Sequence, residues 1–177
     1  MKLYICGEAR HGKDTVAEII SDSYGLSFRD SSKMAMDIFL RESLLDYGLK
    51  YRSDEECYQD RVNHRKLWFD LITAFNGSDP SRLSREIFER ADIYVGIRNR
   101  FEFLESRSMA DLSIWVDASE RIGRVPGEDG YRSGLVLPSD CDIVIQNNGS
   151  RAELEDKVHR LCDLIMGTTV LAELQRH

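Results

Sequence analysis

Apolar residues along the chain occur in short runs separated by longer stretches with helical spacing. Runs that end at a glycine or a polar residue are typical of strands buried on both faces of a parallel sheet. They predict strands at 3–6, 26–28, 92–97, 112–116 and 142–145. The stretches between them predict helices at 13–24, from a cap at Ser31 or Ser32 to Gly48, at 54–75, at 83–88 and from 150 onward. This alternation predicts an α/β fold with three layers around a parallel sheet of roughly five strands.

Size and composition fit one folded domain. The chain has 177 residues, three prolines and no low-complexity tract, so we expect a single domain over residues 1–177. Within it, most of the region at about 31–90 is predicted to be helical. A Gly/Pro-containing stretch at about 119–138 is predicted to be a loop.

Charge and cysteine usage argue against several classes of function. The net charge of −7 makes binding to DNA or RNA backbones unfavourable, although a small anionic ligand needs no global positive charge. The four cysteines form no C-x-x-C pair and no metal-ligand spacing with the histidines, so we expect reduced thiols and no metal site. Neither the run KLYIC nor any other apolar stretch has the length of a signal peptide or a membrane span, which predicts a cytoplasmic protein.

The segment between the first strand and the first helix has the spacing of a phosphate-binding loop, typical of a P-loop NTPase fold. Gly7 and Gly12 let the backbone curl with its N–H groups inward, and Lys13 balances the charge of the outer phosphates. The predicted nucleotide-binding residues here are Gly7, Ala9, Arg10, His11, Gly12, Lys13, Asp14 and Thr15. We expect the His11 side chain to point to solvent. The alternative is a plain glycine turn with a solvated Lys13.

The residue after Lys13 departs from the usual form of this loop. Asp14 stands where Ser or Thr would hold Mg²⁺, and Thr15 follows one place later. Phosphate binding is therefore better supported by the sequence than direct coordination of the metal.

The predicted loop at 119–138 is a candidate lid. It carries Arg121, Arg124 and Arg132, and a closed loop with arginines would expel water and stabilise charge on a moving phosphoryl group. Arg124 and Arg132 are the predicted catalytic residues of the lid, together with Lys13 and Arg98 elsewhere. The alternative is a solvated loop whose arginines pair with neighbouring acids.

Two further groups of residues are candidates for an acceptor site. Arg98 and Glu102 follow a predicted strand, and the carboxyl ends of parallel strands border the crevice where ligands bind. Trp68, Phe69 and Phe75 would suit a wall against which a base stacks, but their helical spacing favours core packing.

Three motifs in order along the chain resemble the deoxynucleoside monophosphate kinases of tailed bacteriophages. They are GKDT at 12–15, VGIRNRFEFLE at 95–105 and DIVIQNNGS at 142–150, and the resemblance spans nearly the whole chain. Dephospho-coenzyme A kinases are similar in the same places.

The resemblance implies roles for individual residues. Lys13 and the loop amides would hold the donor phosphates, and Arg98 would bind the acceptor phosphate. The helical region at 31–90 would be the acceptor-binding insertion, with Phe28, Ser32 and Lys33 at its start and Arg41 and Arg65 as looser matches. Asn147, Gly149 and Ser150 would lie beside the donor base. Relatives often carry an aspartate at the position of Gly96, and Asp14 or Asp117 would have to substitute for it through water.

Three functions remain open at this point. The leading one is transfer of a phosphoryl group from ATP, with Mg²⁺, to a deoxynucleoside monophosphate in the cytoplasm of a phage-infected host. A second keeps the P-loop with another acceptor, such as a modified base in DNA or dephospho-coenzyme A. The third is a nucleotide-binding module without transfer activity. The base and the oligomeric state, a homodimer included, stay open.

Overall fold

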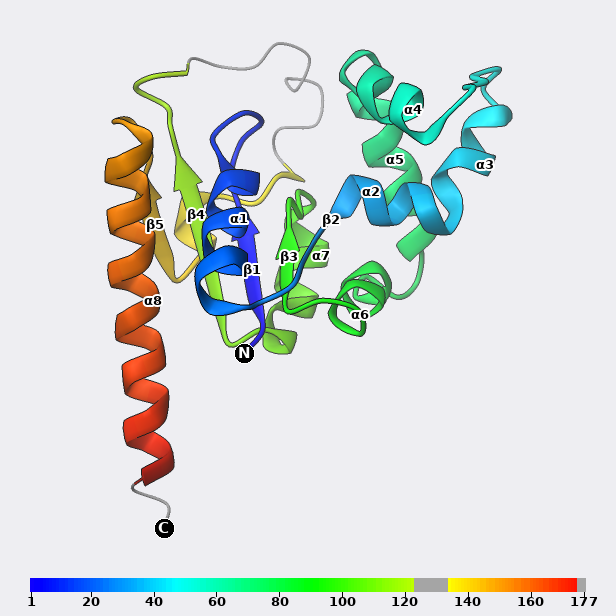
Figure 1. Ribbon diagram of the computed structural model, residues 1–177. Helices are drawn as coiled ribbons and strands as arrows, with labels where there is room; N and C mark the ends of the chain where they lie inside the picture. Colours follow the sequence, from blue (N-terminus) through cyan, green and yellow to red (C-terminus); the bar gives the residue numbers. More distant parts are fainter. Residues whose placement is uncertain (123–133, 175–177) are drawn as a thin grey trace.

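Five parallel strands form one sheet in the order β2-β3-β1-β4-β5 (Figure 1), as seen in a computed structural model that describes residues 1–122 and 134–174. The strands are β1 (Leu3–Cys6), β2 (Phe28–Asp30), β3 (Ile93–Val95), β4 (Leu112–Asp117) and β5 (Ile143–Gln146). Helices cover both faces, so the predicted three-layer α/β fold is confirmed.

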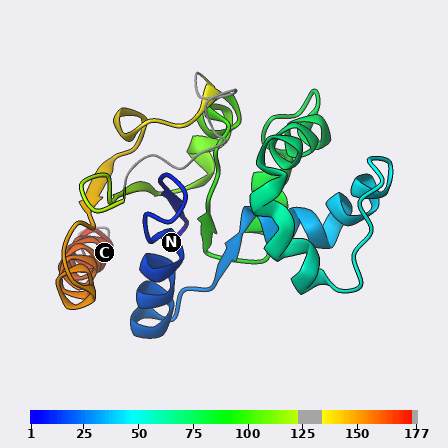
Figure 2. The same cartoon turned by 90° about the horizontal axis from the view of Figure 1, so that it is seen from above.

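Alternate residues of the strands pack into two separate parts of the core, one on each face of the sheet. On one face, Tyr4, Cys6 and Tyr94 pack with α6 (Arg82–Phe88), α7 (Arg100–Ser106) and the first helices of the region 31–76. On the other face, Ile5 and Val95 pack against α1 (Lys13–Tyr24) and α8 (Arg151–Leu174). Figure 2 shows α8 beside β5 and the helices from α2 to α5 at the opposite, β2 side of the sheet.

The first helix has the predicted bounds because a glycine terminates it at each end. Gly12 before the helix and Gly25 after it both have left-handed backbone conformations, with φ of 93° and 71°. The Gly25 N–H donates to the Ser21 carbonyl at 2.9 Å, which satisfies one of the last carbonyls of the helix.

The next helices differ from the prediction at their starts. The strand β2 lies at 28–30 rather than 26–28, and Asp30 at its end is the N-cap of α2 (Ser31–Ala35), accepting from the Lys33 N–H at 2.9 Å. The expectation that Ser31 or Ser32 caps this helix is therefore wrong. The helix continues through a π-helical turn (Met36–Leu40) into α3 (Arg41–Leu45).

The single helix expected at 54–75 is divided into α4 (Asp54–Asp60), a 3-10 turn (Arg61–Asn63) and α5 (Arg65–Asn76). The Asp60 carboxylate explains the break, because it accepts from the Tyr51 hydroxyl and the Asn63 amide, both at 2.7 Å, and lies 3.1 Å from His64 Nε2. These local contacts compete with the helical backbone hydrogen bonds. His64 leaves the helical conformation at φ −125° and ψ 27°.

The remaining described elements are 3-10 turns at Arg107–Met109 and Pro138–Asp140. No helix in the described ranges is long and apolar enough to cross a bilayer. Arg124 and Arg132, and with them most of the predicted lid, lie outside the described residues.

Candidate functional site

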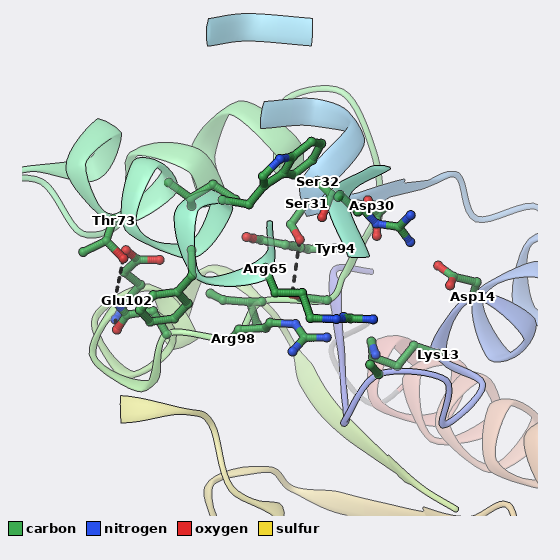
Figure 3. A pocket seen from close by; sticks show the side chains of 18 of the residues that line it. Lys13, Asp14, Asp30, Ser31, Ser32, Arg65, Thr73, Tyr94, Arg98 and Glu102 are labelled. Carbon is green, nitrogen blue, oxygen red and sulfur yellow. Dashed lines mark hydrogen bonds between the residues drawn. The ribbon is translucent and has the colours of Figure 1, made fainter. Parts of the chain in front are cut away.

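One cavity opens at the carboxyl ends of β1, β2 and β3, where ligands bind in open parallel sheets (Figure 3). Its volume is about 1060 Å³ with the open mouth included. The predicted residues that line it are Ala9, Arg10, Lys13, Asp14, Ser32, Arg65, Arg98 and Glu102. The structure thus brings residues from the phosphate loop, the helical region and the end of β3 to one place.

Both glycines of the phosphate loop are required by its geometry. Gly7 has φ 146°, and a Cβ there would lie 2.6 Å from the Val116 carbonyl oxygen. Gly12 has φ 93°, and a Cβ there would lie 2.4 Å from Asn147 Nδ2. Any other residue at either position would be strained and would clash, so the loop conformation depends on glycine twice.

The turn after β5 holds the phosphate loop from behind. The Asn147 side-chain amide donates to the His11 carbonyl at 2.9 Å, and its backbone N–H donates to the Asp117 carbonyl at 2.6 Å. Asn147 is 6% exposed. Its described contacts therefore support the loop, whereas the resemblance placed it beside the donor base.

His11 is buried, and the expectation that it points to solvent is wrong. Only 2% of the residue is exposed, and its Nδ1 accepts from the Ala118 N–H at 3.0 Å. The Asp117 carboxylate lies 3.8 Å from the same nitrogen. His11 and Asp117 line a second cavity behind the loop, so the histidine connects the loop to the end of β4.

Lys13 is the charged residue at the phosphate end of the main cavity. It is 9% exposed, and its Nζ donates to the Glu8 carbonyl at 2.7 Å. Burial lowers the pKa of Lys13 to about 8, with a further contribution from Arg98. The solvated lysine of the alternative interpretation is therefore wrong. An anion beside Lys13 would raise this pKa and stabilise the charged form.

Two arginines lie between Lys13 and the inner end of the cavity. Arg65 comes from the first turn of α5 and Arg98 follows β3, and Figure 3 shows both side chains extending toward Lys13. The backbone of Arg98 is fixed because its carbonyl accepts from the Val136 N–H at 2.8 Å. The site therefore concentrates positive charge in two neighbouring places, one at the loop and one at the arginines.

Asp30 is a site residue that our sequence analysis missed. Burial raises the pKa of its carboxyl, and the charge of Asp14 adds to this, although the Lys33 N–H and two cations act in the opposite direction. The signal that could have indicated Asp30 is a carboxylate at the end of a strand, placed three residues before the residue whose N–H it caps. The carboxylate lies at the mouth of the cavity with Asp14 and Lys13 (Figure 3).

The backbone conformation at Gly96 and its close neighbours explain why this position has no aspartate. It has φ 90°, and a Cβ there would lie 3.4 Å from Ser31 Oγ and 3.6 Å from an Asp30 carboxylate oxygen. The Ser31 hydroxyl also donates to the Gly96 carbonyl at 3.1 Å. An aspartate there would be strained and would place a second carboxylate against Asp30, so Asp30 and Asp14 are the acids of this cavity near Lys13.

The inner end of the cavity is more apolar and contains Glu102. This residue is 5% exposed, in the first turn of α7, whose N-cap Asn99 accepts from the Glu102 N–H at 3.3 Å. Burial raises the pKa of Glu102, and hydrogen bonds from Asn76 and Thr73 partly offset this. Trp68, 4% exposed, also lines the cavity.

The aromatic stripe of α5 is divided between core and cavity. Phe75 stacks on Phe39 with ring centroids 4.1 Å apart and planes 2° apart, so core packing is confirmed there. Trp68 belongs to the core cluster and lines the cavity at the same time, and Phe69 lines the cavity as well.

Several residues suggested by the resemblance do not line this cavity. Phe28 packs against the α1 side of the core, and it starts β2 instead of ending it at the edge where the cavity opens. The Lys33 ammonium lies 5.0 Å from the centre of the Tyr58 ring. Arg41 pairs with Asp54. Gly149 and Ser150 directly precede α8, and the Glu153 carboxylate accepts from the Ser150 N–H at 2.6 Å.

The fold, a parallel sheet in this order with a glycine loop between β1 and α1, is shared with solved structures that include two kinases. The chain is similar to the solved structure of TT1252 from Thermus thermophilus, with 17% identity, a TM-score of 0.53 and coverage of 95% of this chain and 97% of that one. It is also similar to the APS kinase CysC of Mycobacterium tuberculosis in complex with AMPPNP and APS, with 16% identity, a TM-score of 0.51 and coverage of 93% and 96%. Shikimate kinase from Acinetobacter baumannii is similar too, with 13% identity, a TM-score of 0.51 and coverage of 94% of this chain and 93% of that one. No family model and no curated protein sequence matches the chain.

Proposed function

We propose that the protein transfers a phosphoryl group from ATP to a deoxynucleoside monophosphate. The observation that carries this proposal is the arrangement of cations in one cavity, with Lys13 at the phosphate loop and Arg65 and Arg98 next to it. ATP would place its outer phosphates on the loop amides and Lys13. An acceptor phosphate would lie on the two arginines, in line with the γ-phosphate.

The chemistry then requires little from the protein beyond position and charge. An acceptor phosphate oxygen attacks the γ-phosphorus, the bond to the β-phosphate oxygen breaks, and ADP leaves. Arg65 and Arg98 hold the attacking oxygen and offset the repulsion between two polyanions, and Arg124 and Arg132 would stabilise the charge of the transferred group from the lid.

Mg²⁺ would neutralise the β- and γ-phosphates of bound ATP. The residues present fit this ion because two carboxylates, Asp14 and Asp30, lie at the cavity mouth beside Lys13, and the charge of Asp14 contributes to the raised pKa of Asp30. In kinases this ion keeps much of its coordination from water and phosphates, so one or two protein carboxylates suffice.

A second candidate function is favoured by Asp30. A phosphate monoester is already ionised near neutral pH and needs no base, whereas a hydroxyl acceptor must lose its proton during attack. Asp30 is a half-buried carboxyl with a raised pKa next to Lys13, which suits a general base. The second candidate acceptor is therefore one that reacts through a hydroxyl group, as dephospho-coenzyme A would.

A coupled ADP-release assay distinguishes these functions. Wild-type protein with ATP and Mg²⁺ is tested against the four common deoxynucleoside monophosphates and dephospho-coenzyme A, and the Asp30→Asn variant is tested alongside. Loss of a general base costs about 100- to 10,000-fold in rate. We expect turnover of a nucleoside monophosphate and an effect of Asp30→Asn below this range, since Asp14 would still be present for Mg²⁺. Turnover of dephospho-coenzyme A alone, abolished by Asp30→Asn, would establish the second function, and ATP binding without any transfer would leave a binding module.

A further inference from the structure

Two buried polar atoms in the cavity have no hydrogen-bond partner among the described residues. They are Glu102 Oε1, an acceptor, and Trp68 Nε1, a donor. The third such atom in the described ranges is His11 Nε2, in the cavity behind the loop. A buried polar atom left without a partner costs free energy that a bound ligand can recover, so the pair indicates what the ligand presents.

The place of Glu102 in the cavity indicates which part of the ligand it meets. Figure 3 shows Glu102 beside Thr73 at the end of the cavity opposite Lys13 and Asp14, with Arg65 and Arg98 between the two ends. If an acceptor phosphate lies on the arginines, as the proposed function requires, the group that reaches Glu102 is the distal part of the acceptor. For a nucleoside monophosphate this part is the base.

Glu102 is held in place by its neighbours. Asn99 caps the helix that carries it and donates from its own side chain to the Thr73 hydroxyl at 3.2 Å. Hydrogen bonds from Asn76 and Thr73 reach the Glu102 carboxyl group, while Oε1 stays without a partner in the described part of the chain. A rigid carboxylate with a buried open position discriminates well between ligands that do and do not offer a donor there.

We propose that the acceptor base is guanine and that Glu102 is its specificity-determining residue. This inference rests on the proposed function. An ionised carboxylate only accepts hydrogen bonds. Guanine offers adjacent N1–H and N2–H donors on one edge and carries the O6 and N7 acceptors, which suit the open donor of Trp68.

The other common bases fit the carboxylate less well. Adenine and cytosine place a ring-nitrogen lone pair next to their amino group, and thymine places its single N–H between two carbonyl oxygens. Each therefore turns a lone pair toward a carboxylate oxygen. Burial raises the pKa of Glu102, and two N–H donors on the bound base would offset that cost and keep the carboxylate ionised.

The test compares dGMP with dIMP, which lacks only the N2 amino group. A hydrogen bond to a charged group corresponds to about a 10- to 100-fold preference, and we expect wild-type kcat/KM for dGMP to exceed that for dIMP by this factor. In Glu102→Gln the ratio is expected to fall at least about tenfold, because the neutral amide keeps the shape but replaces one acceptor with a donor. Glu105→Gln, an exposed change on the same helix, is the matched control and should leave the ratio unchanged.

The outcomes separate this inference from the proposed function. Turnover of nucleoside monophosphates with equal use of dGMP and dIMP overturns guanine recognition and leaves the kinase intact. If no nucleoside monophosphate is turned over, the proposed function fails. The inference is then decided by the ratio of the affinities for dGMP and dIMP, measured by tryptophan fluorescence. If Glu102→Gln does not fold, as judged by thermal unfolding, the dGMP to dIMP ratio of the wild type remains decisive, and a ratio near one overturns the proposal.

Discussion

The two ends of the cavity are built in different ways. At the phosphate end, a single continuous segment supplies the backbone, and its shape follows from Gly7 and Gly12, where any Cβ would clash. At the inner end, Trp68, Thr73, Tyr94 and Glu102 come from α5, β3 and α7, and each is positioned by tertiary packing. The proposed phosphate binding therefore depends on a local segment, whereas the proposed recognition of the acceptor depends on the assembly of distant elements.

The largest effect is expected at the locally encoded end. Lys13→Ala should lower turnover by at least about 100-fold, because one preorganised electrostatic contact to the reacting group carries that much. The temperature of thermal unfolding of this variant should not fall, since burial of the lysine charge destabilises the ligand-free protein. Steady-state kinetics and calorimetry check this, with Lys66→Ala on the exposed face of α5 as control. Wild-type turnover would remove Lys13 from the mechanism.

A smaller, more selective effect is expected at the arginines. Arg98→Ala should raise the KM for the acceptor by about 10- to 100-fold and change ATP binding much less, because a bidentate contact to a phosphate is not replaced by water. Measured acceptor KM and ATP affinity give the comparison, with the exposed Arg160→Ala on α8 as control. Equal losses for both ligands would mean that Arg98 serves both ends of the cavity.

The lid is expected to act on the rate alone. Neutralising Arg124 and Arg132 together should lower kcat by at least about tenfold, or about 1.4 kcal/mol of transition-state stabilisation, with little change in ATP affinity. Normal turnover with every acceptor would make them surface charges.

The smallest expected effect is a pH dependence of ATP binding. The pKa of Lys13 is about 8 in the free protein, and bound phosphates raise it, so binding takes up a proton above this pH. Affinity should fall about threefold between pH 7.5 and 8.5, and calorimetry in two buffers measures the proton. For the same reason the stability of the free protein should rise with pH between about 8 and 10.5, where the unfolded chain holds the proton more tightly. Lys13→Met should abolish both trends.

Features set by neighbours in sequence were predictable, and those set by distant contacts were not. The bounds of α1 followed from Gly12 and Gly25, and the strands followed from apolar runs. The break before Arg65 did not, because it depends on Asp60 collecting hydrogen bonds from Tyr51 and Asn63. The burial of His11 depends on the backbone of Ala118, far along the chain, so the sequence carried no local signal for it.

The same division separates the site residues. Arg98 and Glu102 were found because both follow a strand whose end borders the ligand crevice. Phe28 was misplaced because the strand lies two residues later than expected, so that Phe28 starts it instead of ending it beside the cavity. Asp30 was missed because two neighbouring serines offered equally good caps, and only the backbone of α2 distinguishes among them.

The hydrogen bond between Asn147 and His11 has a consequence for synthesis of the protein. It joins residues 136 positions apart, and Gly12 lies against the same amide. A growing chain that has left the ribosome only as far as α7 already contains the glycine loop and Lys13, yet it lacks β4, β5 and the amide that supports the loop. If the loop binds ATP as proposed, incomplete chains would lack this support and would bind the nucleotide less well than the finished protein.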